Sequence, residues 1–126
     1  MPYLIDSDVL IDISRGNQAA GAYLDALPEG WAISQISALE LIVGARNNRD
    51  LANIDAFLSD YVIVPLRGST GSRAYQLLKR YAKSHGLHVF DSLVAAAAIE
   101  EDLTLVTRNR RHFEMIEGLS LEVPQY

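Results

Sequence analysis

The stretch Tyr3-Leu4-Ile5-Asp6-Ser7-Asp8 joins a short apolar run to two carboxylates, at the point where a predicted strand turns into a predicted helix. Four more short runs are apolar enough to form strands that are buried on both faces. They are residues 31–33, 61–64, 88–90 and 103–106. Segments of helical length lie between the strands, at residues 7–15, 17–27, 35–46, 50–60, 69–85 and 92–101. This alternation predicts an α/β fold with a five-stranded, mainly parallel sheet that carries helices on both faces.

The composition is that of an ordinary folded domain. The chain has 126 residues, of which 49% are hydrophobic and 21% charged, and no linker or repeat interrupts it, so we expect one domain over residues 1–126. Because cysteine is absent, disulfides, thiolate nucleophiles and zinc–thiolate sites are excluded. The first residues lack basic charge, and the longest apolar run, Leu93 to Ile99, is far shorter than the roughly 20 residues that span a bilayer. We therefore expect a cytoplasmic protein with no membrane partner.

Polar residues follow three of the predicted strands, at the sheet edge where parallel α/β folds bind their ligands. Asp6 follows the first strand, Asp91 follows the fourth, and the segment 107–109 (Thr-Arg-Asn) follows the last. An aspartate at such a turn, taken alone, is more often a helix cap than a catalytic group. Both interpretations therefore stay open for Asp6 and Asp91.

Glu40 favours the catalytic interpretation. Its neighbours along the predicted helix are apolar on nearly every side, so we expect this helix to be buried and the carboxylate to be shielded from water. A lone buried carboxylate is unfavourable unless a partner compensates for its lost hydration. The alternative is a capping box, in which Glu40 accepts a hydrogen bond from the amide of Ser37 at the start of the helix.

Taken together, Asp6, Glu40 and Asp91 predict a metal site. Crowded carboxylates repel one another, and they remain ionised together only when a cation lies between them. A site with oxygen ligands alone favours Mg²⁺ or Mn²⁺ over zinc. Such an ion activates water and neutralises a phosphoryl oxygen, which is the chemistry of phosphodiester hydrolysis.

Four segments resemble, in order and spacing, the motifs of PIN-domain ribonucleases of the VapC toxin type. They are residues 4–11 (LIDSDVLI), 34–45 (SQISALELIVGA), 89–96 (VFDSLVAA) and 103–113 (LTLVTRNRRHF). The resemblance implies a three-layer α/β/α fold and metal-dependent endonucleolytic cleavage of RNA that leaves 5′-phosphate and 3′-hydroxyl ends. It also implies inhibition by a cognate antitoxin and assembly into a homodimer.

The resemblance implies roles for particular residues. Asp6, Glu40 and Asp91 match three acidic residues of the family, so they are the expected catalytic residues and Mg²⁺ ligands. Asn109 stands where many members have a fourth acid, and Asp8 stands where the family often has asparagine. We therefore count Asp8 and Asn109 as additional candidate ligands. Two hydroxyl residues are expected to orient the acids, Ser7 and Thr107.

The basic residues are the candidates for holding RNA. A net charge of −5 disfavours a simple phosphate-binding module, but it allows an enzyme with an acidic centre and a local basic strip. The arginines beside the predicted site are the RNA-binding candidates: Arg108, Arg110 and Arg111. The histidines lack the spacing of metal ligands, so we expect structural roles for them: His85, His88 and His112.

The predicted helices at 17–27 and 50–60 carry apolar residues that form the core, a dimer interface or a groove for a partner helix: Tyr23, Leu27, Ile54 and Phe57.

Two other functions remain as alternatives. The segment from Asp6 to Leu10 also resembles the opening motif of haloacid-dehalogenase-type phosphatases, but the lysine and second acidic pair of that family have no clear counterparts here. The other alternative is a PIN-like binding module without activity, which Asn109 and the negative net charge favour.

Overall fold

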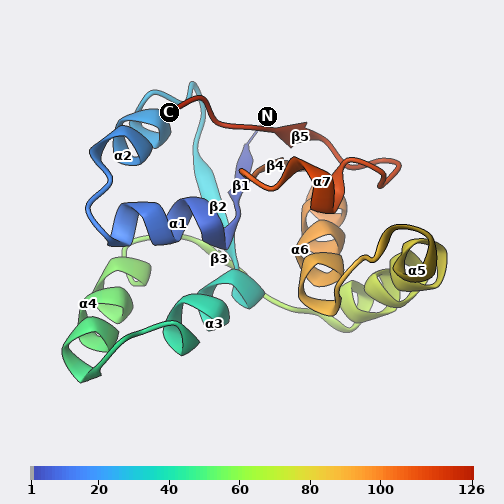
Figure 1. Ribbon diagram of the computed structural model, residues 1–126, viewed down its shortest axis with the longest axis horizontal. Helices are drawn as coiled ribbons and strands as arrows, with labels where there is room; N and C mark the ends of the chain where they lie inside the picture. Colours follow the sequence, from blue (N-terminus) through green and yellow to red (C-terminus); the bar gives the residue numbers. More distant parts are fainter. Residues whose placement is uncertain (1) are drawn as a thin grey trace.

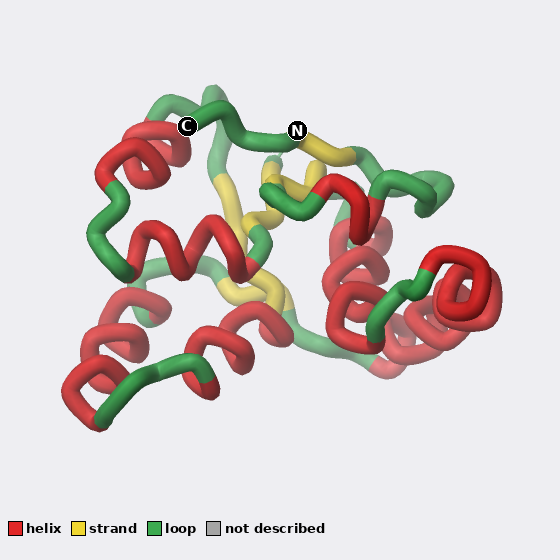
Figure 2. Tube along the Cα trace, in the orientation of Figure 1, coloured by secondary structure: helices red, strands yellow, loops and turns green. Residues whose placement is uncertain are grey.

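Residues 2–126, which the computed structural model describes, form a five-stranded sheet in the order β3-β2-β1-β4-β5 (Figure 1). Every neighbouring pair of strands is parallel, so the predicted parallel sheet is confirmed. The strands are β1 (Tyr3–Ile5), β2 (Trp31–Ser34), β3 (Ile63–Val64), β4 (Thr104–Val106) and β5 (Leu121–Glu122). Figure 2 shows them at the centre of the molecule, with helices to either side.

Helices make every connection between consecutive strands, as a parallel sheet requires. They are α1 (Ser7–Ser14) and α2 (Gln18–Asp25), α3 (Gln35–Val43) and α4 (Asn48–Leu58), α5 (Gly68–His85) and α6 (Val89–Glu100), and the short α7 (Arg110–Phe113). Within residues 2–126, no helix is both long enough and apolar enough to cross a bilayer.

Successive side chains of each strand point to opposite faces of the sheet, so the core has two halves, one on each face. Ile5, Ile33 and Val106 pack with residues of α1 to α4. Leu4 and Leu105, their neighbours in sequence, pack instead with α5, α6 and the segment around α7. Figure 1 shows α1 to α4 on one side of the strands and α5 and α6 on the other. The expected three-layer α/β/α arrangement is confirmed.

The strand predicted at residues 88–90 is wrong. Helix α6 begins at Val89, and the amide of Ser92 donates to the carbonyl of His88 at 2.9 Å, which closes the first helical turn. Val89 and Phe90 are more than half exposed, so they do not form a buried strand. A three-residue apolar run fits either a strand or the start of a helix, and the sequence alone did not separate the two. The fifth strand is β5, which was not predicted.

The apolar surfaces also differ from the prediction. Helix α3 is not buried all round, because Leu39 and Val43 on its outer face are 50% and 84% exposed. Of the residues proposed for the core or a partner surface near α2 and α4, Ile54 is buried in the core, and three are half-buried and pack against it: Tyr23, Leu27 and Phe57.

Two glycines of the α5 region should respond oppositely to alanine. Gly86 ends α5 with a φ of 70°, where a Cβ is strained, so Gly86→Ala should destabilise the fold by about 1 kcal/mol. Gly71 lies inside α5 with open space around a Cβ, so Gly71→Ala should stabilise it by about 0.5 kcal/mol. Urea unfolding measures the free energy of unfolding of both variants. Changes of the same sign in the two variants would contradict this account of the helix end.

Candidate active site

The strand order places a crevice between β1 and β4. The chain runs from β1 outward to β3 and then returns to the other side of β1, and such a switch point opens a cleft beyond the carboxyl ends of the strands. Asp6 directly follows β1 and Thr107 directly follows β4. The Thr107 hydroxyl donates to Asp6 Oδ2 at 2.8 Å, and both residues are buried. Two of the predicted site residues therefore meet at this crevice.

Asp6 combines the two roles that its sequence position allowed. Its Oδ1 accepts a hydrogen bond from the Ser7 amide at 2.8 Å, so it caps α1. Burial, followed by the charge of Asp8, raises the pKa of Asp6 from 3.8 to about 7, although the hydrogen bonds from Thr107 and Ser7 oppose the rise. Asp91 also contributes to the rise. The ionised form of Asp6 is therefore unfavourable although the residue caps a helix. The carboxylate of an ordinary helix cap is stabilised instead.

Asp8 lies two residues after Asp6, in the first turn of α1, and faces the same crevice. Its Oδ2 accepts a hydrogen bond from the Arg108 amide at 2.9 Å, which ties α1 to the segment after β4. Its Oδ1 accepts from the Val9 amide at 2.7 Å. Burial raises the pKa of Asp8, and these two amides oppose that rise. Asp8 is therefore part of the acidic cluster.

Glu40 reaches the cluster from α3, and the capping-box alternative is wrong. Helix α3 starts at Gln35, two residues before Ser37, and the Ser37 amide donates to Ser34 Oγ at 3.1 Å. The side chain of Ser7 instead interacts with the Glu40 carboxylate and lowers its pKa. Burial, and then the charge of Asp91, raises the pKa of Glu40.

Asp91 lies in the first turn of α6 rather than at the end of a strand. Its Oδ2 is 3.0 Å from Nδ1 of His112, a residue of α7. Burial raises the pKa of Asp91, and His112 opposes that rise. The role of Asp91 stays a prediction, and the element that the sequence assigned to it is wrong.

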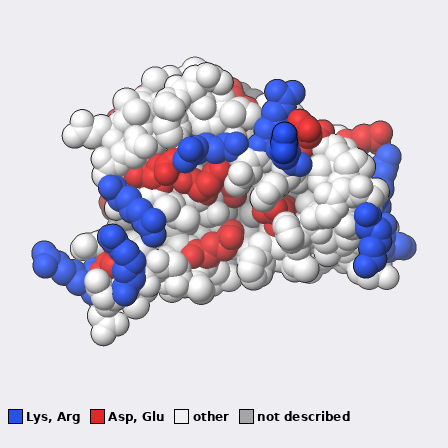
Figure 3. Space-filling view, viewed as in Figure 1, with Lys and Arg blue, Asp and Glu red and all other residues white. Residues whose placement is uncertain are grey.

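Four carboxylates from three helices or helix starts thus influence one another's pKa: Asp6, Asp8, Glu40 and Asp91. Figure 3 shows acidic side chains gathered on this face over α1, α3 and the start of α6, with basic side chains around them. Within residues 2–126, no three His, Asp or Glu side chains are arranged so that they could hold one metal ion together. The oxygen donors still fit Mg²⁺, because that ion usually keeps several waters and binds only one or two carboxylates directly.

Comparison with known proteins identifies the family. The model of the PIN domain matches residues 3–118. The chain belongs to the PIN-domain family.

Close relatives share nearly the whole length of this PIN domain. Ribonuclease VapC10 of Mycobacterium tuberculosis is 39% identical over 119 residues, which cover 92% of this chain and 89% of the relative. Ribonuclease VapC19 of the same organism is 37% identical over 120 residues, which cover 92% and 95%. A toxin–antitoxin complex from Klebsiella pneumoniae has a chain with 29% identity and a TM-score of 0.82, covering 98% of both chains. The resemblance inferred from the motifs is confirmed, and the phosphatase alternative is excluded.

The remaining candidate ligand of the PIN domain lies at the edge of the crevice. Asn109 is exposed, its amide donates to Thr107 Oγ1 at 3.1 Å, and its side chain does not cap α7. Its role as a ligand stays a prediction. Thr107 therefore bonds to both Asp6 and Asn109, and the amide of Ser7 bonds to Asp6. The orienting roles of Thr107 and Ser7 stay predictions.

The three candidate RNA-binding arginines differ in their surroundings. Arg108 pairs with Asp12 at 2.7 Å and lies over the ring of Tyr126, whose hydroxyl also donates to Asp12. Arg110 pairs with Glu114 one helical turn away at 3.1 Å. Arg111 has no ion pair in the part of the chain that the structure describes.

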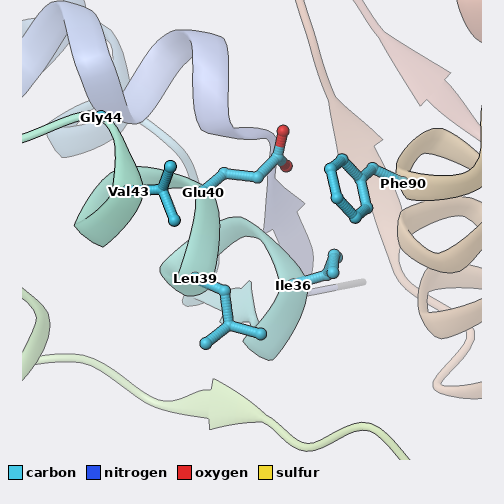
Figure 4. Close-up of a pocket in the computed structure, with 6 residues that line it drawn as sticks. All are labelled: Ile36, Leu39, Glu40, Val43, Gly44 and Phe90. Carbon is cyan, nitrogen blue, oxygen red and sulfur yellow. The ribbon is translucent and has the colours of Figure 1, made fainter.

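An apolar pocket of about 370 Å³ adjoins the acids (Figure 4). Figure 4 shows Glu40 extending from α3 on the side where Phe90 projects from α6. The remaining lining residues come from α3 and its end: Ile36, Leu39, Val43 and Gly44. The pocket therefore has an acid at its inner side and exposed hydrophobic groups at its rim.

Sequence reasoning missed three residues that hold the site: Asp12, His112 and Tyr126. His112 lies 21 residues after Asp91, and Tyr126 lies 114 residues after Asp12, so no local spacing connects either pair. Only the packing of α7 and the last residues against α6 and α1 brings these groups together.

The raised pKa of Asp6 predicts a pH-dependent gain in stability for Asp6→Asn. Between about pH 4 and pH 7 the folded chain holds a proton that the unfolded chain has lost, so wild-type stability falls as the pH rises through that window. Without divalent ions, the free energy of unfolding of Asp6→Asn should therefore be about 2 kcal/mol higher than that of the wild type at pH 8. This difference should vanish below pH 4.

Urea unfolding in a chelator at several pH values measures this difference. The control is Asp25→Asn, at the exposed end of α2, which should show no such pH dependence. If the wild type is more stable than Asp6→Asn at pH 8, the buried charge of Asp6 does not destabilise the fold as proposed.

Proposed function

We propose that this PIN domain is an endoribonuclease that hydrolyses RNA phosphodiester bonds and acts as the toxin of a toxin–antitoxin pair. The observation that carries the proposal is the gathering of Asp6, Asp8, Glu40 and Asp91 at the switch point of the sheet, each with a raised pKa. A purely structural role would not keep four like charges in this unfavourable arrangement. Relatives named ribonucleases that match nearly the full chain support the same activity.

The cofactor in this proposal is Mg²⁺ or Mn²⁺. Asp6, Glu40 and Asp91 would hold it, at most two of them directly and the rest through water, with Asp8 and Asn109 as additional candidate ligands. When bound, the ion supplies a water of lowered pKa and neutralises charge on a phosphoryl oxygen. The protein would contribute the carboxylate oxygens that bind the ion, and the ion would in turn attract the scissile phosphate.

Each of the three main acids has a partner that fixes its orientation. Thr107 and the Ser7 amide hold the two oxygens of Asp6. The side chain of Ser7 holds Glu40, and His112 holds Asp91. Groups that are held before the substrate arrives lose little freedom during the reaction, which is a main source of catalytic rate.

The RNA backbone lies along the three arginines that follow β4, Arg108, Arg110 and Arg111, of which Arg111 lines the same cavity as Asp91. Contacts of this kind position a phosphate backbone, but they do not read a sequence. The protein works in the cytoplasm, where its RNA substrate is found, and it forms a homodimer.

The acids provide the direct test of the enzyme. Asp91→Asn should lower the Mg²⁺-dependent cleavage of RNA at least 100-fold, because the site loses a charge that no other residue replaces, while Asp25→Asn should retain full activity. Gel analysis of an RNA substrate measures the rate and should detect 5′-phosphate and 3′-hydroxyl ends. A wild type that neither cleaves RNA nor binds Mg²⁺ in calorimetry would support the inactive binding module instead.

The cognate antitoxin is proposed to cover the apolar pocket beside Glu40. Val43 at its rim is 84% exposed, so Val43→Asp should leave the fold stable while it places a charge in the apolar contact. We expect at least tenfold weaker inhibition of RNA cleavage by the antitoxin, with uninhibited activity unchanged.

The matched control is Val62→Asp, which alters an exposed valine before β3 that does not line the pocket. Size-exclusion chromatography of both variants reports the oligomeric state. If Val43→Asp separates a dimer but leaves inhibition intact, the pocket is the contact between two copies rather than the antitoxin site.

A further inference from the structure

A second cavity, of about 250 Å³, is lined by Asp91 but by none of the other three acids of the cluster. It is bounded by the end of α5, the start of α6 and helix α7. Its lining includes Gly86, Leu87, Asp91 and Arg111, together with all three histidines of the chain: His85, His88 and His112. Residues that showed no metal-ligand spacing in the sequence thus converge at one place beside the proposed active site.

The walls of this cavity offer a cation and aromatic rings. The rings of His88 and His112 lie edge to face, with their centroids 6.1 Å apart. His112 is already bonded to Asp91, which fixes its ring. Arg111 is exposed and makes no ion pair within residues 2–126, so its guanidinium is available to a ligand.

These groups match the chemistry of a nucleotide. A guanidinium binds a phosphate through two parallel hydrogen bonds, and imidazole rings stack on bases and donate to their edges. A free phosphate would meet the negative charge of Asp91. A nucleotide that belongs to an RNA chain would instead be held in place by its neighbour at the acids.

We propose that this cavity binds the nucleotide next to the scissile phosphate, with its phosphate on Arg111 and its base against His88. The inference rests on the proposed ribonuclease function and extends it, because Asp91 forms a wall common to the acidic cluster and the cavity. Stacking of a base on an aromatic ring and a phosphate–arginine pair are the contacts that RNA enzymes use to hold single strands. The cavity therefore contributes to substrate affinity, and it leaves the chemical step to the acids.

Steady-state kinetics with RNA substrates of different length test this role. With a full-length substrate, His88→Ala and Arg111→Ala should each raise KM at least fivefold and change kcat less than twofold. With a substrate shortened by the nucleotide on one side of the cleavage site, the same variants should match the wild type, because the group that they would contact is gone. The matched control is Arg49→Ala on α4, far in sequence from the cavity, which should leave KM unchanged for both substrates.

The outcomes separate this site from the nuclease itself. Suppose that the wild type cleaves RNA and that the variants raise KM by the same factor on full-length substrates and on substrates shortened on either side of the cleavage site. The cavity is then not a nucleotide site. If the wild type does not cleave RNA, the nuclease proposal fails, and NMR signals of the histidines then test the cavity independently. Saturable shifts of the His88 and His112 signals with a short single-stranded RNA would support the site, and unchanged signals would overturn it.

Discussion

The hydrogen bond from Thr107 to Asp6 is the contact on which the site depends. It joins the ends of the two strands that border the switch point, and it satisfies one oxygen of a carboxylate that is only 5% exposed. The bond reduces the cost of burying Asp6 but does not remove it, as the pKa of about 7 shows. The fold therefore maintains an unfavourable charge at one point, which is typical of functional rather than structural groups.

The layered architecture determines where the other acids come from. Asp8 and Glu40 belong to helices that pack on one face of the sheet, whereas Asp91 belongs to α6 on the opposite face. The carboxylates approach one another only because both layers extend beyond the strand ends. The separation between the acids is therefore set by the thickness of the sheet and by the starting points of α1, α3 and α6.

The sequence predicted those features that depend on local pattern. Asp6, Glu40 and Asp91 were recognised by motif, and the parallel sheet was recognised by the alternation of strands and helices. The segment 88–90 was assigned wrongly because three apolar residues have no period that separates a strand from a first helical turn. The pairing of His112 with Asp91 and the two-residue strand β5 depend on distant packing, for which the sequence carries no local signal.

The order in which the residues are synthesised determines when the acidic cluster can form. All four carboxylates precede residue 92, but the strand beside β1 and the groups that hold Asp6 and Asp8 lie at residues 104–108. A growing chain that has not reached these residues carries every acid without the bonds from Thr107 and Arg108. The finished centre therefore exists only after synthesis has passed residue 108, and chains released before that point do not contain it.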